Sequence, residues 1–281
     1  MPKKSPQQRN RKKTLVKKPI ALGIGVLLLI LLVARVSYFL FNGASFFETY
    51  QNLANPYVRV VHISAGLRKE QIADIYGNAL AWNASEKSAF LAAGNTSSSH
   101  NFEGYYYPDT YLVSLGETGT SVSQKMISKF NQVVAPQASK SNKKIINVDT
   151  AVKIASIIQR EAAGPQDMKL ISGIIWNRLF EGMELDMDAT LQYAKGNSQN
   201  GWWPQVVPAD KKINSPYNTY KNEGLPPSAI SNPSLAAIQA AYNPQATDCI
   251  FYFHDANRQI HCSATYAEHV AKIKQYFSLK S

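Results

Sequence analysis

The sequence predicts an α+β fold, in which short helices surround small antiparallel sheets. Two regions alternate polar and apolar residues as strands do: residues 57–66, and the pair "CIFYF" and "QIHCS" near the end of the chain. Segments of helical periodicity lie between and after them, separated by polar loops and without an internal repeat. With 281 residues, 45% of them hydrophobic, the chain is long enough to bury a core.

The N-terminal region combines a basic tail with a long apolar run. Residues 1–18 hold eight Lys or Arg and no acid. Residues 20–41, "IALGIGVLLLILLVARVSYFLF", carry only Arg35 as a charge, and about 20 apolar residues span a bilayer core. We therefore expect a cytoplasmic tail at 1–18 and a transmembrane helix at 19–41, followed by an extracytoplasmic part. The alternative is a cleaved signal peptide, although the apolar run exceeds the usual ~7–15 residue signal core.

The composition of the rest of the chain excludes several function classes. Of the formal net charge of +11, the tail holds +8, so the other residues carry only +3 (22 basic minus 19 acidic) and give no sign of nucleic-acid binding. No zinc spacing, phosphate-binding glycine loop or GxSxG motif occurs. We expect neither a cofactor nor a metal site, and we interpret the proximity of His254 and His261 across the hairpin as a solvated edge.

The first exported unit is predicted at residues 57–136, after a juxtamembrane connector at 42–56. A strand at 57–66 is followed by a helix at 67–80. A polar loop, an aromatic segment "FEGYYYPDTY" and an amphipathic helix "VSQKMISKFNQVV" come next. The polar stretch "APQASKSNKK", residues 135–144, indicates a domain boundary.

The second exported unit is predicted at residues 145–281. It begins with a helix at about 150–163 that Asp149 would cap. The later helices are "QDMKLISGIIWNRLFEG", which Gly182 closes; "DATLQYAK", which Asp188 would cap; "NPSLAAIQAAYNP"; and "YAEHVAKIKQYF". A loop region that contains several prolines, residues 196–228, lies between the helix "DATLQYAK" and the helix "NPSLAAIQAAYNP".

Cys249 and Cys262 are the only cysteines, and both fall in the predicted hairpin. A turn centred on Asp255–Arg258 would set residue 251 opposite 262, which makes the two cysteines diagonal neighbours. An extracytoplasmic location permits a disulfide. Two buried free thiols are the alternative.

Glu161 is the first candidate catalytic residue. It continues the apolar stripe of Ile154 and Ile158 on the first helix of the second unit. A carboxyl group packed against apolar side chains has a raised pKa, which suits a general acid. The alternative is a structural role, in which Glu161 turns outward or pairs with Arg160 or Lys169.

Residues 215–234, "SPYNTYKNEGLPPSAISNPS", are rich in hydrogen-bonding groups and rigid aromatic rings. Tyr217 and Tyr220 are suited to stacking on sugar rings, and Asn218 and Thr219 to binding hydroxyls. Trp202 and Trp203 are further stacking candidates. The alternative is an ordinary surface loop with scattered aromatic residues.

Several of these motifs occur together, in one order and spacing. They are "FEGYYYPDTY", "IASIIQREA", "IIWNRLFEGMELDMDATLQYA", "SPYNTYKNEGLPPSAISNPSLAAIQAAYNP" and "FYFHDANRQIHCSATYAEHV". Together they resemble the endolytic murein transglycosylase family, also called the YceG-like family, over nearly all of residues 57–277.

The resemblance implies a LysM-like module at about 57–95 and a catalytic α+β domain in the second unit. It implies that Glu161 is the catalytic residue. The substrate-binding positions that it implies, or that the polar loop suggests, are Asn177, Arg178, Asp186, Asp188, Thr190, Tyr217, Asn218, Thr219, Tyr220, Leu225, Pro226 and His261. The chain departs from the family pattern at Asp186, where glutamine is usual, at Ala189, a common proline, and at Cys262, usually aromatic. We expect the carboxylate of Asp186 to raise the pKa of Glu161 further or to alter sugar contacts.

The implied activity is cleavage of the MurNAc–GlcNAc bond of nascent peptidoglycan without water, which leaves 1,6-anhydroMurNAc ends. The anchor would hold the enzyme at the cell (inner) membrane, where it would terminate or trim glycan polymerisation beside peptidoglycan synthases. One alternative is a non-catalytic, membrane-anchored glycan-binding scaffold. Another is a hydrolase in which Asp186 or Asp188 positions water.

Overall fold

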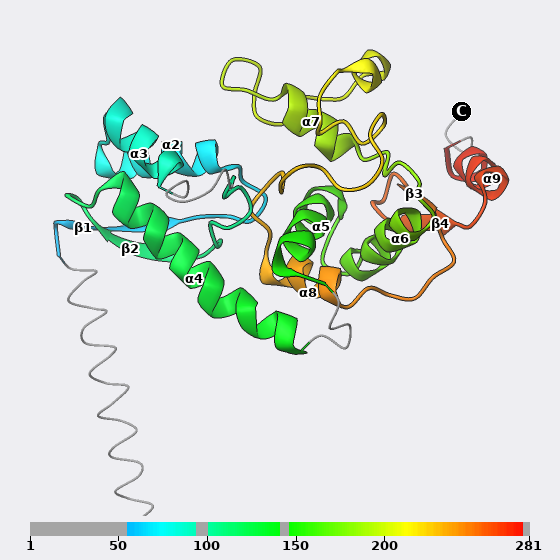
Figure 1. The fold of residues 1–281 in the computed structure, drawn as a ribbon. Coiled ribbons are helices and arrows are strands. Elements are labelled where there is room, and N and C mark those ends of the chain that lie inside the picture. Colours follow the sequence, from blue (N-terminus) through cyan, green and yellow to red (C-terminus); the bar gives the residue numbers. More distant parts are fainter. Residues whose placement is uncertain (1–54, 94–100, 141–145, 278–281) are drawn as a thin grey trace, which may run out of the picture. The chain divides into compact units, whose positions relative to one another are not determined.

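A computed structural model describes residues 55–93, 101–140 and 146–277 (Figure 1). The described residues belong almost entirely to one compact unit that begins at Tyr57. The expected cytoplasmic tail and transmembrane helix lie outside the described residues, as do most of the connector and of the polar loop at 94–101. Within the described ranges, no helix combines the length and the apolar character needed to cross a membrane.

The N-terminal part of this unit is a β–α–α–β arrangement. The two strands pair antiparallel, with Val61 opposite Tyr111. Its elements are β1 (Val58–His62), α2 (Lys69–Leu80), α3 (Ala84–Ala92) and β2 (Thr110–Ser114). The predictions of a strand at 57–66 and a helix at 67–80 are thereby confirmed.

Alternation along both strands builds the first of two hydrophobic cores. Val61, Tyr111 and Val113 are buried, whereas Val60 and Leu112 face solvent. Apolar side chains of α2, α3 and the helix that follows β2 cover the buried face, and the members of this first core include Ile72, Tyr76, Phe90, Val122 and Met126.

Helix α4 (Gly119–Lys140) runs through the stretch in which we expected a domain boundary to begin. It continues past Pro136, so the expected break at 135–144 is wrong for its first six residues. The reason lies in its apolar stripe at i, i+4 spacing. Met126 belongs to the first core, while Phe130 and Val134 belong to the second. The helix therefore contributes to both cores.

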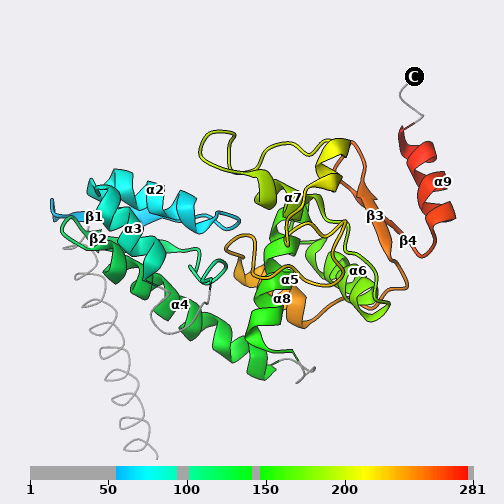
Figure 2. The same cartoon turned by 45° about the horizontal axis from the view of Figure 1, so that its top comes forward.

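The second core is built around α5 (Val148–Glu161), which contacts α6 (Met168–Phe180), α7 (Asp188–Lys195) and α8 (Leu235–Tyr242). Figure 2 shows α5 lying among these helices. Ile154, Ile157 and Ile158 are fully buried on it. A short 3₁₀ helix, η1 (Pro208–Lys212), lies within the loop region that precedes α8.

Two of the expected helix caps are wrong. Asn147, not Asp149, caps α5, because its side chain accepts a 2.7 Å hydrogen bond from the amide of Thr150. Asp149 instead pairs with Lys153 one turn along the helix. Asp188 is the first residue of α7 and caps nothing, because its carboxylate accepts a hydrogen bond from Tyr220.

The chain ends in a hairpin of β3 (Phe251–His254) and β4 (Ile260–Ser263), followed by α9 (Tyr266–Phe277). Tyr252 lies opposite Cys262, so the expected register is wrong by one residue. The amide of Asp255 donates to the carbonyl of Gln259, which closes a loop of three residues instead of four. Cys249 and Cys262 form a disulfide with Cα atoms 5.7 Å apart, so the free-thiol alternative is wrong.

Candidate active site

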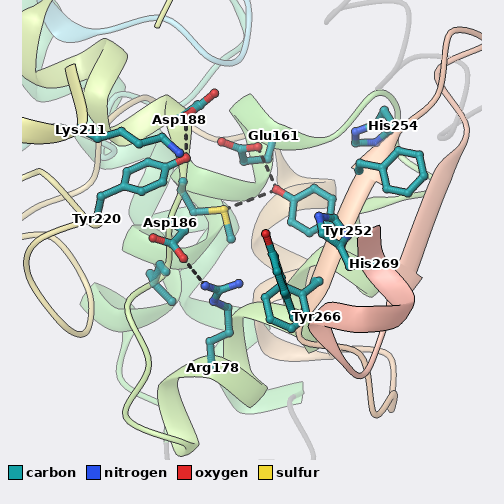
Figure 3. Close-up of a pocket in the computed structure, with 14 residues that line it drawn as sticks. Glu161, Arg178, Asp186, Asp188, Lys211, Tyr220, Tyr252, His254, Tyr266 and His269 are labelled. Carbon is teal, nitrogen blue, oxygen red and sulfur yellow. Dashed lines mark hydrogen bonds and ion pairs between the residues drawn. The ribbon is translucent and has the colours of Figure 1, made fainter. Parts of the chain in front are cut away.

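A cavity of about 500 Å³ lies where the C-terminal end of α5 meets the hairpin and the loop before α7 (Figure 3). Acidic, basic and aromatic side chains line it. Its walls comprise Glu161, Arg178, Leu185, Asp186, Met187, Asp188, Lys211, Tyr220, Phe251, Tyr252, Phe253, His254, Tyr266 and His269. The candidate catalytic residue therefore faces a space that is large enough for a sugar ligand.

Glu161 is the last residue of α5, and its carboxyl group is held from two sides. Its Oε1 accepts a 3.1 Å hydrogen bond from the amide of Ala189, and its Oε2 accepts a 2.8 Å hydrogen bond from the hydroxyl of Tyr252. Arg160, one of the two cations that the alternative structural role offered as a partner, instead stacks on Trp203, with its guanidinium 3.9 Å from the ring centroid. The carboxyl group thus points into the cavity (Figure 3).

The surroundings of Glu161 act on its pKa in opposite directions, and the net effect is a raised pKa. Burial is the largest influence and favours the neutral acid, and the charge of Asp188 adds to it. The hydrogen bonds from Ala189 and Tyr252 favour the carboxylate, as does His254. Ala189 lies in the first turn of α7, where amide groups point out of the helix toward an anion. The surroundings therefore favour the protonated form of Glu161, and the two hydrogen-bond donors still stabilise its carboxylate form.

Asp186 and Asp188 provide two further carboxylates in the cavity. Asp188 accepts a 2.7 Å hydrogen bond from the hydroxyl of Tyr220. Asp186 forms an ion pair with Arg178, from a backbone in the left-handed region at φ +55°. The influences on Glu161 include Asp188 but not Asp186, so the expected effect of Asp186 on the pKa of Glu161 is not found.

Arg178 is buried, and its guanidinium is fixed by the chain around it. Its Nε and Nη1 donate 2.8 Å hydrogen bonds to the carbonyls of Glu184 and Ile250, and its Nη2 pairs with Asp186. It thereby joins α6 to the loop before α7 and to the start of β3. Arg178, Asp186, Asp188 and Tyr220 are the expected binding residues that line the cavity.

Four other expected binding residues point into the protein. Asn177 donates to the carbonyls of Thr247 and Cys249. Thr190 and Thr219 are 0% and 1% exposed and share a 2.8 Å hydrogen bond. Asn218 is also 0% exposed and donates to the carbonyls of Lys211 and Ile213. Direct contact of these four side chains with sugar hydroxyls does not fit this structure; they hold the loops that carry the cavity walls.

The remaining expected residues also lie outside the lining of the cavity. Tyr217 packs on Tyr193 and bonds to Ser228 through its hydroxyl. Leu225 packs against the second core, and Pro226 is buried. His261 bonds to Asp255 and lies against the ring of Tyr276 on α9. Among the described residues, no group of three or more His, Cys, Asp or Glu side chains is arranged to hold a metal ion.

The sequence reasoning missed Tyr252, His254, Lys211, Tyr266 and His269, all of which line the cavity. For Tyr252 and His254, the alternation of side chains along the predicted strand could have indicated that they share one face. Residues 252 and 254 lie on one face of the strand, where Tyr252 reaches Glu161 and His254 reaches the buried Asp167 at 3.2 Å.

The chain is similar to several known proteins. The profile of the YceG-like family matches residues 30–275. A protein of Streptococcus pneumoniae serotype 2 (strain D39) named endolytic murein transglycosylase is 33% identical over 189 residues, which cover 64% of this chain and 34% of that protein. A protein of Bacillus subtilis (strain 168) with the same name is 32% identical over 188 residues, which cover 66% of this chain and 51% of that protein.

The fold also has a counterpart among solved structures. The crystal structure of a YceG-like protein from Listeria monocytogenes superposes with a TM-score of 0.66 at 27% identity, covering 76% of this chain and 75% of that one. The matched region spans only a third to a half of the two named relatives. About half to two thirds of each relative's length is therefore without a counterpart in this chain.

Proposed function

The chain belongs to the YceG-like family, and we propose that it is a membrane-anchored endolytic lytic transglycosylase that cleaves the MurNAc–GlcNAc bond of nascent peptidoglycan. The observation that carries the proposal is Glu161. A half-buried carboxyl group with a raised pKa faces the cavity and keeps two hydrogen-bond donors on its oxygens. Such a group can give a proton and take one back, as a lone acid–base catalyst must.

In the first step, the protonated Glu161 gives its proton to the glycosidic oxygen. The bond from C1 of the muramyl residue to that oxygen breaks, and the GlcNAc-bearing part leaves with a new hydroxyl group. Positive charge develops at C1. The carboxylate of Asp188, on the cavity wall, supplies negative potential toward this charge, whereas the charge of Asp186 is compensated by Arg178.

In the second step, the Glu161 carboxylate takes the proton of the muramyl 6-hydroxyl, whose oxygen bonds to C1. The product is a 1,6-anhydro ring, and Glu161 is protonated again. No water is consumed, because the substrate supplies the nucleophile. During this cycle the carboxylate is stabilised by the amide of Ala189 and the hydroxyl of Tyr252. Tyr252 stays neutral, since burial beside Glu161 holds its pKa well above the ordinary range.

The rest of the chain would bring this site to its substrate. We propose that the segment at 19–41 anchors the protein in the cell membrane with the described residues outside. The LysM-like glycan-binding module that the resemblance implies at about 57–95 falls in the β–α–α–β arrangement at the start of the described unit, whose second strand lies beyond it at Thr110–Ser114. This placement suits an enzyme that ends or trims strands as peptidoglycan synthases release them.

Product analysis tests the proposal. The full chain in detergent is incubated with nascent glycan strands, and the products are analysed by mass spectrometry. We expect 1,6-anhydroMurNAc ends within the strands. New reducing ends would indicate a hydrolase using Asp186 or Asp188 instead, and intact strands that remain bound would indicate a glycan-binding scaffold.

A further inference from the structure

A second groove lies beside the cavity, and the side chains of His254 and Asp167 stand between the two spaces. It has a volume of about 550 Å³ and lies between the loop after α5 and the turn of the hairpin. Its lining residues are Ala163, Gln166, Asp167, Asn257, Arg258, Gln259 and Ile260. His254 lines the cavity and Asp167 lines this groove, and the two side chains are 3.2 Å apart. The two spaces are therefore neighbours.

Arg258 provides the exposed positive charge of this groove. Its Nη2 donates a 2.8 Å hydrogen bond to the carbonyl of Ala163, and its other N–H groups donate to no acceptor among the described residues. The acids nearby are already engaged: Asp167 accepts from the amide of Ala163 and contacts His254, and Asp255 pairs with His261. The guanidinium is thus available to an anion, which it can bind through two parallel hydrogen bonds.

The backbone of Arg258 indicates that its side chain matters. It lies at φ +61°, in the left-handed region where three-residue hairpin loops favour glycine or asparagine. An arginine there carries a conformational cost of order 1 kcal/mol. The side chain offsets this cost in part through its hydrogen bond to the carbonyl of Ala163, and a contact with a bound anion would offset it further.

The other polar side chains of the groove suit a peptide. Gln166, Asn257 and Gln259 are exposed, and their side-chain amides form no hydrogen bond within the described ranges. Each amide offers both a donor and an acceptor, which is what the backbone of a bound peptide needs. The groove thus combines one exposed cation with neutral hydrogen-bonding groups, and its one carboxylate, Asp167, is buried and engaged by His254 and the amide of Ala163. This combination fits a short acidic peptide.

We propose that this groove binds the peptide substituent of the muramyl residue and that Arg258 pairs with one of its carboxylates. The inference rests on the proposed function, which places a muramyl residue next to Glu161. Its peptide must leave the cavity, and a chain of two or three extended residues spans about 10 Å. That length is sufficient to pass the pair of His254 and Asp167.

The test compares two substrates. The full chain and its Arg258→Gly variant cleave peptide-bearing glycan strands or the same strands stripped of peptides by an amidase. Glycine relieves the positive φ, so the variant is expected to fold at least as stably as the parent. We expect its kcat/KM on peptide-bearing strands to fall about 10-fold, the effect of losing a charge-assisted hydrogen bond, with the loss confined to that substrate. Arg258→Lys, which keeps the charge, should retain part of the preference.

Equal kcat/KM values for Arg258→Gly and the parent on peptide-bearing strands, or an equal loss on both substrates, would overturn the proposal. A second readout uses N-acetylmuramyl-tripeptide as a ligand of the Glu161→Gln protein, where Arg258→Gly should weaken binding by a similar factor. Absence of anhydro ends from the parent chain on either substrate would instead contradict the proposed function. The tripeptide measurement would still decide whether the groove binds a muramyl peptide.

Discussion

The hydroxyl of Tyr252 on β3 donates a 2.8 Å hydrogen bond to Oε2 of Glu161, the last residue of α5. The two residues are 91 positions apart in the chain. The bond favours the carboxylate of Glu161, while burial favours the neutral acid and prevails. Tyr252 therefore limits, together with the amide of Ala189, how far the pKa of Glu161 is raised, and it gives the acid a partner after proton transfer.

Tyr252→Phe removes this donor without removing the aromatic ring. We expect kcat to fall about 10-fold, because the anion formed in the first step loses a hydrogen bond. The pKa of Glu161 should rise further, since an influence that lowers it is gone. The pH profile of kcat/KM, in which the protonated acid is the active form, should therefore extend to higher pH. An unchanged profile and an unchanged kcat would show that Tyr252 does not act on Glu161.

Glu103 makes stability depend on pH at a place remote from the cavity. It is 0% exposed, and it accepts hydrogen bonds from the amide of Lys69 and from the side chain of Asn232. Burial raises its pKa from 4.5 to about 8. The folded state thus holds a proton that the unfolded state has lost, so its stabilising contribution is complete below pH 4.5 and declines until the pH passes about 8.

We expect Glu103→Gln to remove this dependence. Relative to the variant, the wild type should lose up to about 1.4 kcal/mol of stability per pH unit between pH 4.5 and 8. Tm measured across this range for both proteins gives the difference directly. Glu223→Gln, at an exposed acid that is not among the groups acting on the pKa of Glu103, is the matched control and should track the wild type closely. A constant difference between Glu103→Gln and the wild type would mean that Glu103 is ionised throughout.

The disulfide between Cys249 and Cys262 holds the end of the chain that carries Tyr252. It closes a loop of 13 residues in sequence separation. Cys249→Ser with Cys262→Ser should lower the free energy of unfolding by about 3 kcal/mol, which lowers Tm by several degrees. A reducing agent should lower the Tm of the wild type similarly and leave the double variant unchanged. Equal responses of both proteins to the reductant would refute a disulfide in the folded chain.

Local patterns allowed most elements to be predicted. The apolar spacing of Ile154 and Ile158 predicted a helix that brings Glu161 toward the interior; the helix is found, and Glu161 is half-buried at its end. Features that depend on a single hydrogen bond, such as the residue that caps α5, were not predicted. Asn147 and Asp149 are both good capping residues, and which of them caps α5 depends on where the helix starts, a boundary that local pattern fixes only to within a few residues.

The composition of the site could not be predicted in the same way. Asn218 and Thr219 have side chains suited to sugar hydroxyls, yet both are buried and bond to other parts of the chain. Side-chain chemistry alone does not distinguish a polar group that binds a ligand from one that supports a loop. Conversely, Ala189 contributes through its backbone amide, and a backbone contact leaves no residue-type signal.

The measurement that tests the central claim most directly is the yield of 1,6-anhydroMurNAc ends from the Glu161→Gln variant. Glutamine keeps the size of the side chain and can still accept from Ala189, so the variant should fold with a Tm at least equal to the wild type near neutral pH. Glu181→Gln, at the exposed end of α6, is the matched control and should retain full activity. We expect Glu161→Gln to lower the yield at least about 100-fold; a folded variant that still forms these ends at the wild-type rate would contradict the assignment of Glu161 as the catalytic acid.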